Sequence, residues 1–409
     1  MRGIRTNRTP GVTANKNSGM RKYGGILLIV TCCWCVAMAQ PGKPRPSMKD
    51  SLDRKFDMSD YLIEANGFVP VPFIITEPAL GGFGGVIAPI FIKKNPPYLD
   101  SIDGKLVRTP VAPNVTGGAA AYTLNNTWLL MGFRSGTLVK ARIKYVIGGG
   151  FVNLNMNFYE EFPHIGQKEL LFNIKAVPLI LQGSKRIGFS HWYAGLKYLF
   201  LKAKVSFTGD HKLDSLSQSL ESDKLISALG ALVELDSRDN IFTPDKGIKF
   251  HTDASLSDQF FGSDFNFWRM NYYGYGYLPV AEGRNGNGRL IAGLRIDGQQ
   301  VFGDLPFYMK PYINMRGIPA ERYQGNATLL SELELRWDFV MRWSAVIFSG
   351  VGTAFDEWSE LGSSSWVASY GAGFRYLLAR KFRLRVGVDV AHGPDTWAYY
   401  IVFGSNWLK

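Results

Sequence analysis

Cysteine and long apolar runs are scarce in this sequence of 409 residues. The three cysteines, Cys32, Cys33 and Cys35, all lie close to the N-terminus, so the rest of the chain holds no disulfide, zinc–thiolate site or cysteine nucleophile. Beyond residue 40, no stretch of about 18 residues is both apolar and uncharged, which excludes a polytopic helical membrane protein. The chain is nevertheless 46% hydrophobic and rich in glycine and aromatic residues, which excludes a disordered protein.

The first 39 residues have the parts of a secretory signal peptide. A basic start without acidic residues precedes an apolar run from Gly24 to Val36, and Ala37-Met38-Ala39 has the small-x-small form of a cleavage site. The sequence therefore predicts a signal peptide at residues 1–39 and export of the rest. Removal of this segment lowers the net charge from +12 to +6, which leaves little reason to expect a nucleic-acid partner.

Residues 40–66 are polar and rich in proline, lysine and aspartate, and we interpret them as a periplasmic leader with one short helix near residues 47–58. From residue 67 to residue 409, the chain consists of segments of about ten residues in which apolar and polar side chains alternate. A period of two places the two sets on opposite faces of a strand. Two clear examples are Leu333, Leu335 and Trp337 alternating with Glu332, Glu334 and Arg336, and Val152, Leu154, Met156 and Phe158 alternating with Asn153, Asn155 and Asn157.

The composition of the two faces indicates a membrane protein. The polar sets are rich in Gly, Asn, Arg and Asp, and the apolar sets end in Trp and Tyr, as in a barrel with lipid outside, a polar lumen and aromatic girdles. An exported chain without a spanning helix can cross a bilayer only as a closed barrel. The sequence therefore predicts an all-β fold, a transmembrane antiparallel β-barrel of about 16 strands over residues 67–409.

The connections between the expected strands alternate between long loops and short turns, as in membrane barrels. Residues 93–115 break this order, because they are long but fall on the short-turn side. The final strand is expected to span residues 396–407. The expected long loops cover residues 160–168, 208–224, 302–326 and 356–365.

The loop at residues 302–326 is unusual, because it holds five aromatic residues and three prolines. Such a composition predicts a loop that packs on other groups, and the nearest cavity is the lumen. Its centre reads Met315-Arg316-Gly317-Ile318, and the next strand carries Glu334-Leu335-Arg336. With the upstream turn at residues 236–247, these motifs resemble the BamA/TamA superfamily of outer-membrane assembly barrels, also called bacterial surface antigens.

The resemblance implies a long sixth outer loop folded into the barrel, and a location in the bacterial outer membrane. It further implies a role in the insertion or translocation of outer-membrane proteins or lipids, with outer-membrane lipid and unfolded outer-membrane proteins as partners. Two departures stand out. Residues 40–66 are too short for one polypeptide-binding (POTRA) repeat, so a periplasmic or membrane partner would have to supply that function. The family's second anchor, Phe-x-Asp-x-Gly, has Gly350 in place of Asp, two residues after Phe348.

Elementary electrostatics gives the loop motif a role. A charged Arg316 inside a lumen is costly unless it is paired, and Glu332, Glu334 and Arg336 are expected to face the same lumen. We therefore expect Arg316 to form a charge-assisted pair with Glu334 that fixes the loop to the inner wall. Gly317 would allow the tight turn. The alternative is a surface arginine in a flexible loop.

The barrel must close between its first and last strands. Pro70 and Pro72 interrupt the first strand and cannot donate ladder hydrogen bonds. A weakly paired seam would suit lateral opening, and the prolines could equally do no more than trim the start of the strand. The residues expected along this seam are Phe73, Ile75, Tyr399, Ile401 and Phe403.

Enzymatic chemistry has little support in this sequence. The five histidines are scattered, and none has metal-ligand spacing or a nucleophile motif nearby. We expect no catalytic residue, cofactor or metal. The alternative to an assembly role is a passive pore or a structural outer-membrane protein.

Overall fold

The computed structural model describes residues 47–64, 68–75, 83–102, 105–109, 111–162, 166–208, 222–283 and 287–407. The predicted signal peptide lies outside these residues. Within them, one α-helix, α2 (Ser59–Glu64), precedes the strands, and no helix is long and apolar enough to span a bilayer. The strands are β1 (Phe68–Ile75), β2 (Gly84–Lys93), β3 (Tyr98–Ile102), β4 (Lys105–Thr109), β5 (Asn114–Thr123), β6 (Trp128–Leu138), β7 (Ile143–Phe162), β8 (Gly166–Arg186), β9 (Trp192–Phe207), β10 (Ser222–Asp236), β11 (Gly247–Ser257), β12 (Phe267–Ala281), β13 (Arg289–Gly303), β14 (Ala327–Val340), β15 (Trp343–Phe355), β16 (Trp366–Ala379), β17 (Leu384–His392) and β18 (Trp397–Phe403).

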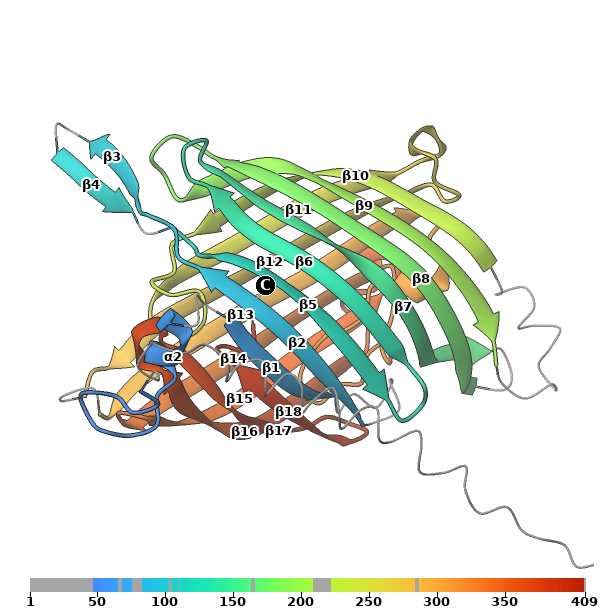
Figure 1. Cartoon of the computed structure of the whole chain (residues 1–409). Helices are drawn as coiled ribbons and strands as arrows, with labels where there is room; N and C mark the ends of the chain where they lie inside the picture. The colour runs from blue at the N-terminus through green and yellow to red at the C-terminus, as the bar shows by residue number, and fades with distance from the viewer. Residues whose placement is uncertain are drawn as a thin grey trace, which may run out of the picture. The chain divides into compact units, whose positions relative to one another are not determined.

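Sixteen of these strands form one antiparallel sheet that curves into a nearly closed barrel (Figure 1). Each strand pairs with the next barrel strand along the chain, in the order β1-β2-β5 and then β6 to β18. The predicted all-β barrel of about 16 strands is therefore confirmed. We call the end where β1 begins and β18 finishes the turn end, and the opposite end the loop end.

The break in the predicted alternation has a simple cause. Residues 93–115 contain a separate two-stranded hairpin, β3–β4, inserted between β2 and β5 at the turn end. Asp100 of this hairpin forms ion pairs of 2.7 Å with both Arg142 and Arg186 at the neighbouring turns. On either side of the insertion the wall continues without a break, because β2 pairs in antiparallel fashion with both β1 and β5.

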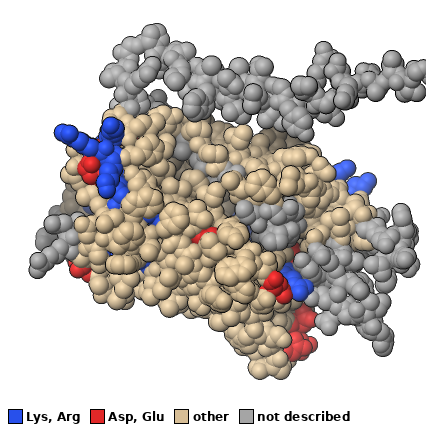
Figure 2. Space-filling model, turned by 90° about the horizontal axis from the view of Figure 1, so that it is seen from below, with Lys and Arg blue, Asp and Glu red and all other residues tan. Residues whose placement is uncertain are grey.

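Burial confirms the expected faces of β14. Leu333 and Trp337 are 50% and 52% exposed and point to the outside of the wall, whereas Glu332 and Arg336 are buried inside it. Large apolar side chains are exposed along the outer wall in the same way on many other strands. The side of the barrel shown in Figure 2 carries few charged residues over its middle, as expected for a surface in contact with lipid.

The expected faces of β7 are wrong at its loop end. Leu154 and Met156 face inward and pack with Phe172, Phe307 and other lumen residues, so the asparagine set faces outward. Two physical reasons account for this reversal. The loop between β13 and β14 fills this part of the lumen with apolar side chains. On the other face the asparagines find polar partners, because Asn155 donates to the carbonyl of Asn125 in the β5–β6 loop at 2.8 Å and Asn173 donates to Asn153 at 3.0 Å. The long loop expected at residues 160–168 is also wrong, because β7 extends to Phe162 and β8 begins at Gly166.

Two further boundaries differ from expectation. The last strand ends at Phe403, and Gly404, with a φ of 75°, turns the chain inward so that Trp407 is buried in the lumen. Residues 47–58 form no helix. Asp50 and Asp53 accept hydrogen bonds from the backbone N–H groups of Leu52 and Lys55, and such local bonds compete with helix formation, so the helix begins at Ser59.

Candidate functional site

The connection between β13 and β14 is the sixth at the loop end, and we call it loop 6. Its first part, with the 3₁₀ turn η6 (Phe307–Met309), packs against inward side chains of β8, β9, β10, β12 and β13. The ring centroids of Phe307 and Phe172 are 4.9 Å apart, and Tyr308 packs against the buried cluster of Ile226, Phe267 and Val301. Loop 6 therefore occupies the lumen at the loop end.

Arg316, in the centre of loop 6, is almost completely buried among three carboxylates. Its Nη1 atom lies 2.9 Å from both Glu334 and Asp389, and its Nε atom lies 3.2 Å from Glu332. We call these four residues the Arg316 cluster. A buried guanidinium is tolerated only with such partners. The structure thus contains the expected pair with Glu334 and adds carboxylates from β14 and β17.

The substitution of Gly350 for the family's Asp has a structural explanation. A Cβ atom at position 350 would lie 2.5 Å from Sδ of Met315 and 2.7 Å from Cγ of Glu332. The glycine therefore makes room for Met315, and Asp389, two strands away, supplies the carboxylate instead. Phe348 lies where the motif predicts, with its ring centroid 3.5 Å from Cζ of Arg316.

The residues on either side of Arg316 fix the turn. Gly317 has a φ of 84°, and a Cβ atom there would lie 3.0 Å from the backbone of His392 and Gly393, so both conformation and space require glycine. Its N–H donates to the hydroxyl of Tyr400 at 2.9 Å. Ile318 packs with Met315 and other apolar side chains of the loop and wall.

Glu332 connects loop 6 to two other parts of the lumen. Its carboxylate accepts from Arg316, from Nη1 of Arg295 at 2.7 Å and from Nε1 of Trp407 at 3.1 Å. The C-terminal segment therefore enters the lumen from the turn end and meets the same carboxylate as loop 6. The parts played by Arg295, Asp389 and Trp407 were not predicted from the sequence. Asp389 was recognisable on the polar face of its strand, but nothing in the sequence indicated which inward carboxylate would meet Arg316.

Arg336 does not join the Arg316 cluster. It lies nearer the turn end, where its guanidinium pairs with Asp245 of the β10–β11 turn and with Asp338. Residues 244–245 of this turn thus reach into the lumen near the turn end. Among the described residues, no group of His, Cys, Asp and Glu side chains could hold a metal ion.

The edges of the sheet meet at the seam. β1 and β18 lie next to each other, but among the described residues they form no ladder, whereas every other pair of neighbouring wall strands does. The side chains of Tyr399 and Ile401 are exposed and half-buried, respectively, and Ile75 and Phe403 are also half-buried. The side chain of Phe73 lies outside the described residues.

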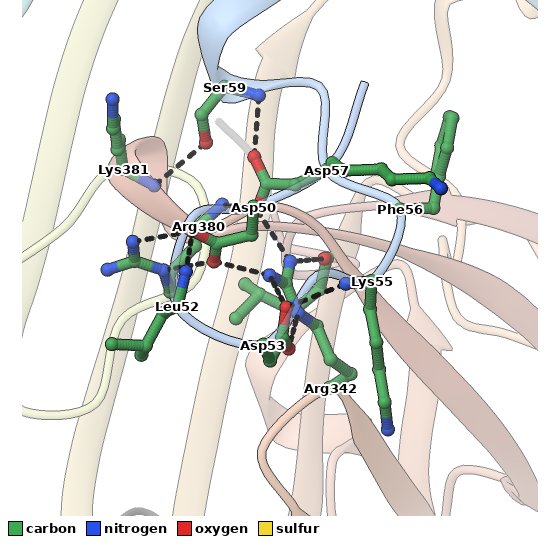
Figure 3. Close-up of polar contacts among 12 residues, drawn as sticks. Asp50, Leu52, Asp53, Lys55, Phe56, Asp57, Ser59, Arg342, Arg380 and Lys381 are labelled. Atoms are coloured by element: carbon green, nitrogen blue, oxygen red, sulfur yellow. Dashed lines mark hydrogen bonds and ion pairs between the residues drawn. The ribbon is translucent and has the colours of Figure 1, made fainter. Parts of the chain in front are cut away.

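A second charged cluster lies at the turn end, between the leader and the wall (Figure 3). Arg342, in the β14–β15 turn, is completely buried and pairs with Asp50, with Asp53 at 2.7 Å and with Asp57 at 2.5 Å. Arg380, in the β16–β17 turn, also pairs with Asp50. We call these five residues the Arg342 cluster. The hydrogen bond from Arg380 holds the pKa of Asp50 well below its usual range.

Comparison with known proteins decides the family. Residues 184–396, just over half of the chain, match the Omp85 superfamily domain. The chain belongs to the Omp85 superfamily. This is the family that includes BamA and CdiB barrels, and its members act in insertion and translocation at the bacterial outer membrane. In such barrels the short turns face the periplasm, so the turn end is the periplasmic end.

Solved structures of this family share the fold. CdiB from Escherichia coli aligns with a TM-score of 0.53 and 9% identity over 81% of this chain and 62% of its own length. CdiB from Acinetobacter baumannii aligns with a TM-score of 0.52 and 11% identity over 81% and 57%, respectively. BamA from Haemophilus ducreyi lacking POTRA domains 1–3 gives a TM-score of 0.48 and 12% identity over 82% and 68%. This chain thus spans about three fifths of the CdiB chains. No curated protein sequence matches it.

Proposed function

We propose that this Omp85 barrel assists the insertion or translocation of outer-membrane proteins or lipids by opening the seam between β1 and β18. The observation that carries the proposal is that, within the described part of the chain, β1 and β18 form no ladder although every other pair of neighbouring wall strands does. Lipid and unfolded outer-membrane proteins would be its partners, and a periplasmic or membrane protein would supply the POTRA function.

The prolines of β1 support this role for the seam. β1 pairs with β2 along its whole length, and proline is tolerated in a strand where its nitrogen points away from a ladder. Pro70 and Pro72 are two residues apart, so their backbone nitrogens point to the same side of β1. Both positions that lack an N–H donor therefore belong to the edge that faces β18. Closing this seam therefore yields fewer hydrogen bonds than closing any regular strand pair.

The contents of the lumen favour this function over a passive pore. Loop 6 lies inside the lumen at the loop end, and Trp407 and the β10–β11 turn lie inside it at the turn end. Polypeptide or lipid could pass through the seam in the wall while these plugs stay in place. A steady, wide pore would need both to leave.

Cysteine cross-linking in cells tests the proposal. The chain outside its predicted signal peptide has no cysteine, so a pair at Ile75 and Tyr399 would be the only thiols in the barrel. Oxidation should lower the amounts of client proteins in outer-membrane proteomics, and a reductant should restore them. A matched pair across the regular β13–β14 ladder, at Leu294 and Leu333, should have no effect in either state. Unchanged client levels with a fully cross-linked seam would contradict the proposal.

A further inference from the structure

The leader joins the two sides of the seam. α2 ends at Glu64, only a few residues before β1 begins at Phe68. The partners of the leader, however, lie in the β14–β15 and β16–β17 turns. In the order of the wall, β17 and β18 separate these turns from β1. The leader therefore reaches past the seam and binds the wall on its far side.

We propose that residues 48–62 are a latch that holds the seam closed at the periplasmic end, and that release of the Arg342 cluster lets β1 move away from β18. This inference rests on the proposed function, because it assigns a regulator to the same seam. It gives the leader a role beyond connecting the barrel to the preceding chain.

The latch is attached mainly by charge. Met48, Leu52 and Phe56 are 41%, 64% and 48% exposed, so these large apolar side chains of the leader add little buried surface. Leu62 is the exception, with 3% exposure. The attachment instead consists of the Arg342 cluster together with a few hydrogen bonds to the wall. An attachment of this kind can be released without exposing a large apolar surface.

The backbone contacts extend the attachment along the leader. The N–H of Met58 donates to the carbonyl of Leu378 at 2.8 Å, and the hydroxyl of Tyr376 donates to the carbonyl of Phe56 at 2.7 Å. Asp57 also accepts from the N–H of Arg380 at 3.0 Å. All these wall groups belong to β16 or its turn, so they act as one docking site for the leader.

Removal of Arg342 would break the latch as a unit. Three aspartates converge on this one guanidinium, and without it Asp53 loses its ion pair and Asp50 and Asp57 lose one each. The remaining carboxylates would be buried next to one another, and breaking a buried pair in this way is strongly unfavourable. Release of the leader into water relieves that repulsion.

The test compares Arg342→Gln with Lys381→Gln in the full chain, reconstituted in lipid nanodiscs. Lys381 pairs with Asp60 at 2.6 Å at the same interface, but both side chains are more than one third exposed. Exposed pairs contribute little to stability, so Lys381→Gln is a matched control for loss of one positive charge. Hydrogen exchange of residues 48–62 reports attachment of the leader. Spin labels at Pro70 and Phe403, in the turn-end halves of β1 and β18, report the width of the seam.

We expect Arg342→Gln to raise the exchange rate of the leader by roughly tenfold or more, as loss of a buried ion pair implies. The same variant should populate a wider seam, while Lys381→Gln should resemble the wild type in both readouts. A freed leader with an unchanged seam would overturn the latch. A wider seam in Arg342→Gln would support the latch. If client levels were at the same time unchanged by the seam cross-link, the latch would stand and the proposed function would be refuted.

A tethered variant keeps the test decisive if Arg342→Gln fails to fold. Cysteines at Met58 and Leu378, whose backbones are joined by a hydrogen bond of 2.8 Å, would lock the leader to β16 when oxidised. The latch predicts a narrower distribution of seam widths in the oxidised form and return to the wild-type distribution after reduction. No difference between the two forms would contradict it.

Discussion

The Arg316 and Arg342 clusters have the same composition at their centres, but the wall and the segment that it binds supply opposite charges in the two. Each buries one arginine among three carboxylates. In the first, loop 6 supplies the arginine, and two wall strands supply the acids. In the second, the wall supplies the arginine, and one short leader segment supplies every acid.

This difference bears on how each element can detach. Loop 6 is held by apolar packing and by Phe348 and Tyr400 in addition to its ion pairs, so loss of one contact leaves many others. The leader has few contacts besides its charges. The comparison teaches that similar charge clusters can serve a permanent plug in one place and a releasable latch in another.

The largest effect on stability is expected for Arg316→Gln. It leaves Glu334 without its ion pair to loop 6 and removes one partner from Glu332 and Asp389, so we expect a loss of about 3–5 kcal/mol. Heat-modifiable mobility on cold SDS gels measures the unfolding of the barrel. Arg322→Gln is the control, because its pair with Asp395 is partly exposed and should contribute less than about 1 kcal/mol. Equal melting of the two variants would remove the distinction between a buried cluster and a surface pair.

Gly350→Asp tests whether the second carboxylate has moved to Asp389. The new side chain would meet Met315 and place a further negative charge beside Glu332, so we expect destabilisation of about 1–3 kcal/mol from overpacking alone. The double variant Gly350→Asp with Met315→Ala relieves the steric conflict and should recover part of the loss in the same gel assay. A single variant as stable as the wild type would show that the space at position 350 is not limiting.

Trp407→Phe should have a smaller effect. The substitution keeps an aromatic ring near Tyr275 but removes the hydrogen bond to Glu332, which still has Arg295 and Arg316 as partners. A net loss of about 1 kcal/mol is expected for one hydrogen bond. Trp358→Phe, at a half-exposed ring in the β15–β16 loop, is the matched control. If both changes proved neutral, the C-terminal segment would not contribute to the plug.

The fold was predictable because a barrel repeats one simple pattern. The period of two in segments such as residues 332–337 locates strands, and the resemblance at Arg316 and Gly317 locates loop 6. The pattern fails where another element decides the environment. In β7, alternation identifies two faces but not the inner one, because loop 6 makes the lumen apolar there.

The Arg342 cluster was unpredictable for a related reason. Asp50, Asp53 and Asp57 recur at spacings that fit a solvated polar segment, and Arg342 lies in a two-residue turn that resembles any basic turn. Their meeting depends on contacts between residues almost 300 positions apart, which one sequence does not reveal. The position of Trp407 in the lumen was hidden in the same way, because the turn at Gly404 lies inside what reads as one continuous strand.

Low pH should detach the leader and leave the wall of the barrel folded. Of the predicted changes, this one should have the smallest effect on the stability of the whole barrel. The pKa values of Asp50, Asp53 and Asp57 are lowered in the folded protein, with hydrogen bonds from Arg342 and Arg380 among the causes. A lowered pKa stabilises attachment above the ordinary aspartate value of about 4, and this stabilisation is lost as the pH falls further.

Hydrogen exchange, corrected for the intrinsic effect of pH, should show stable protection of residues 48–62 from pH 7 to pH 5 and progressive loss below pH 4. The strands of the wall should stay protected over that range, and in Arg342→Gln the leader should be unprotected at every pH. Detachment that begins near neutral pH would instead indicate a titrating group other than these three aspartates, and would break the contrast between a charge-held leader and a packed loop.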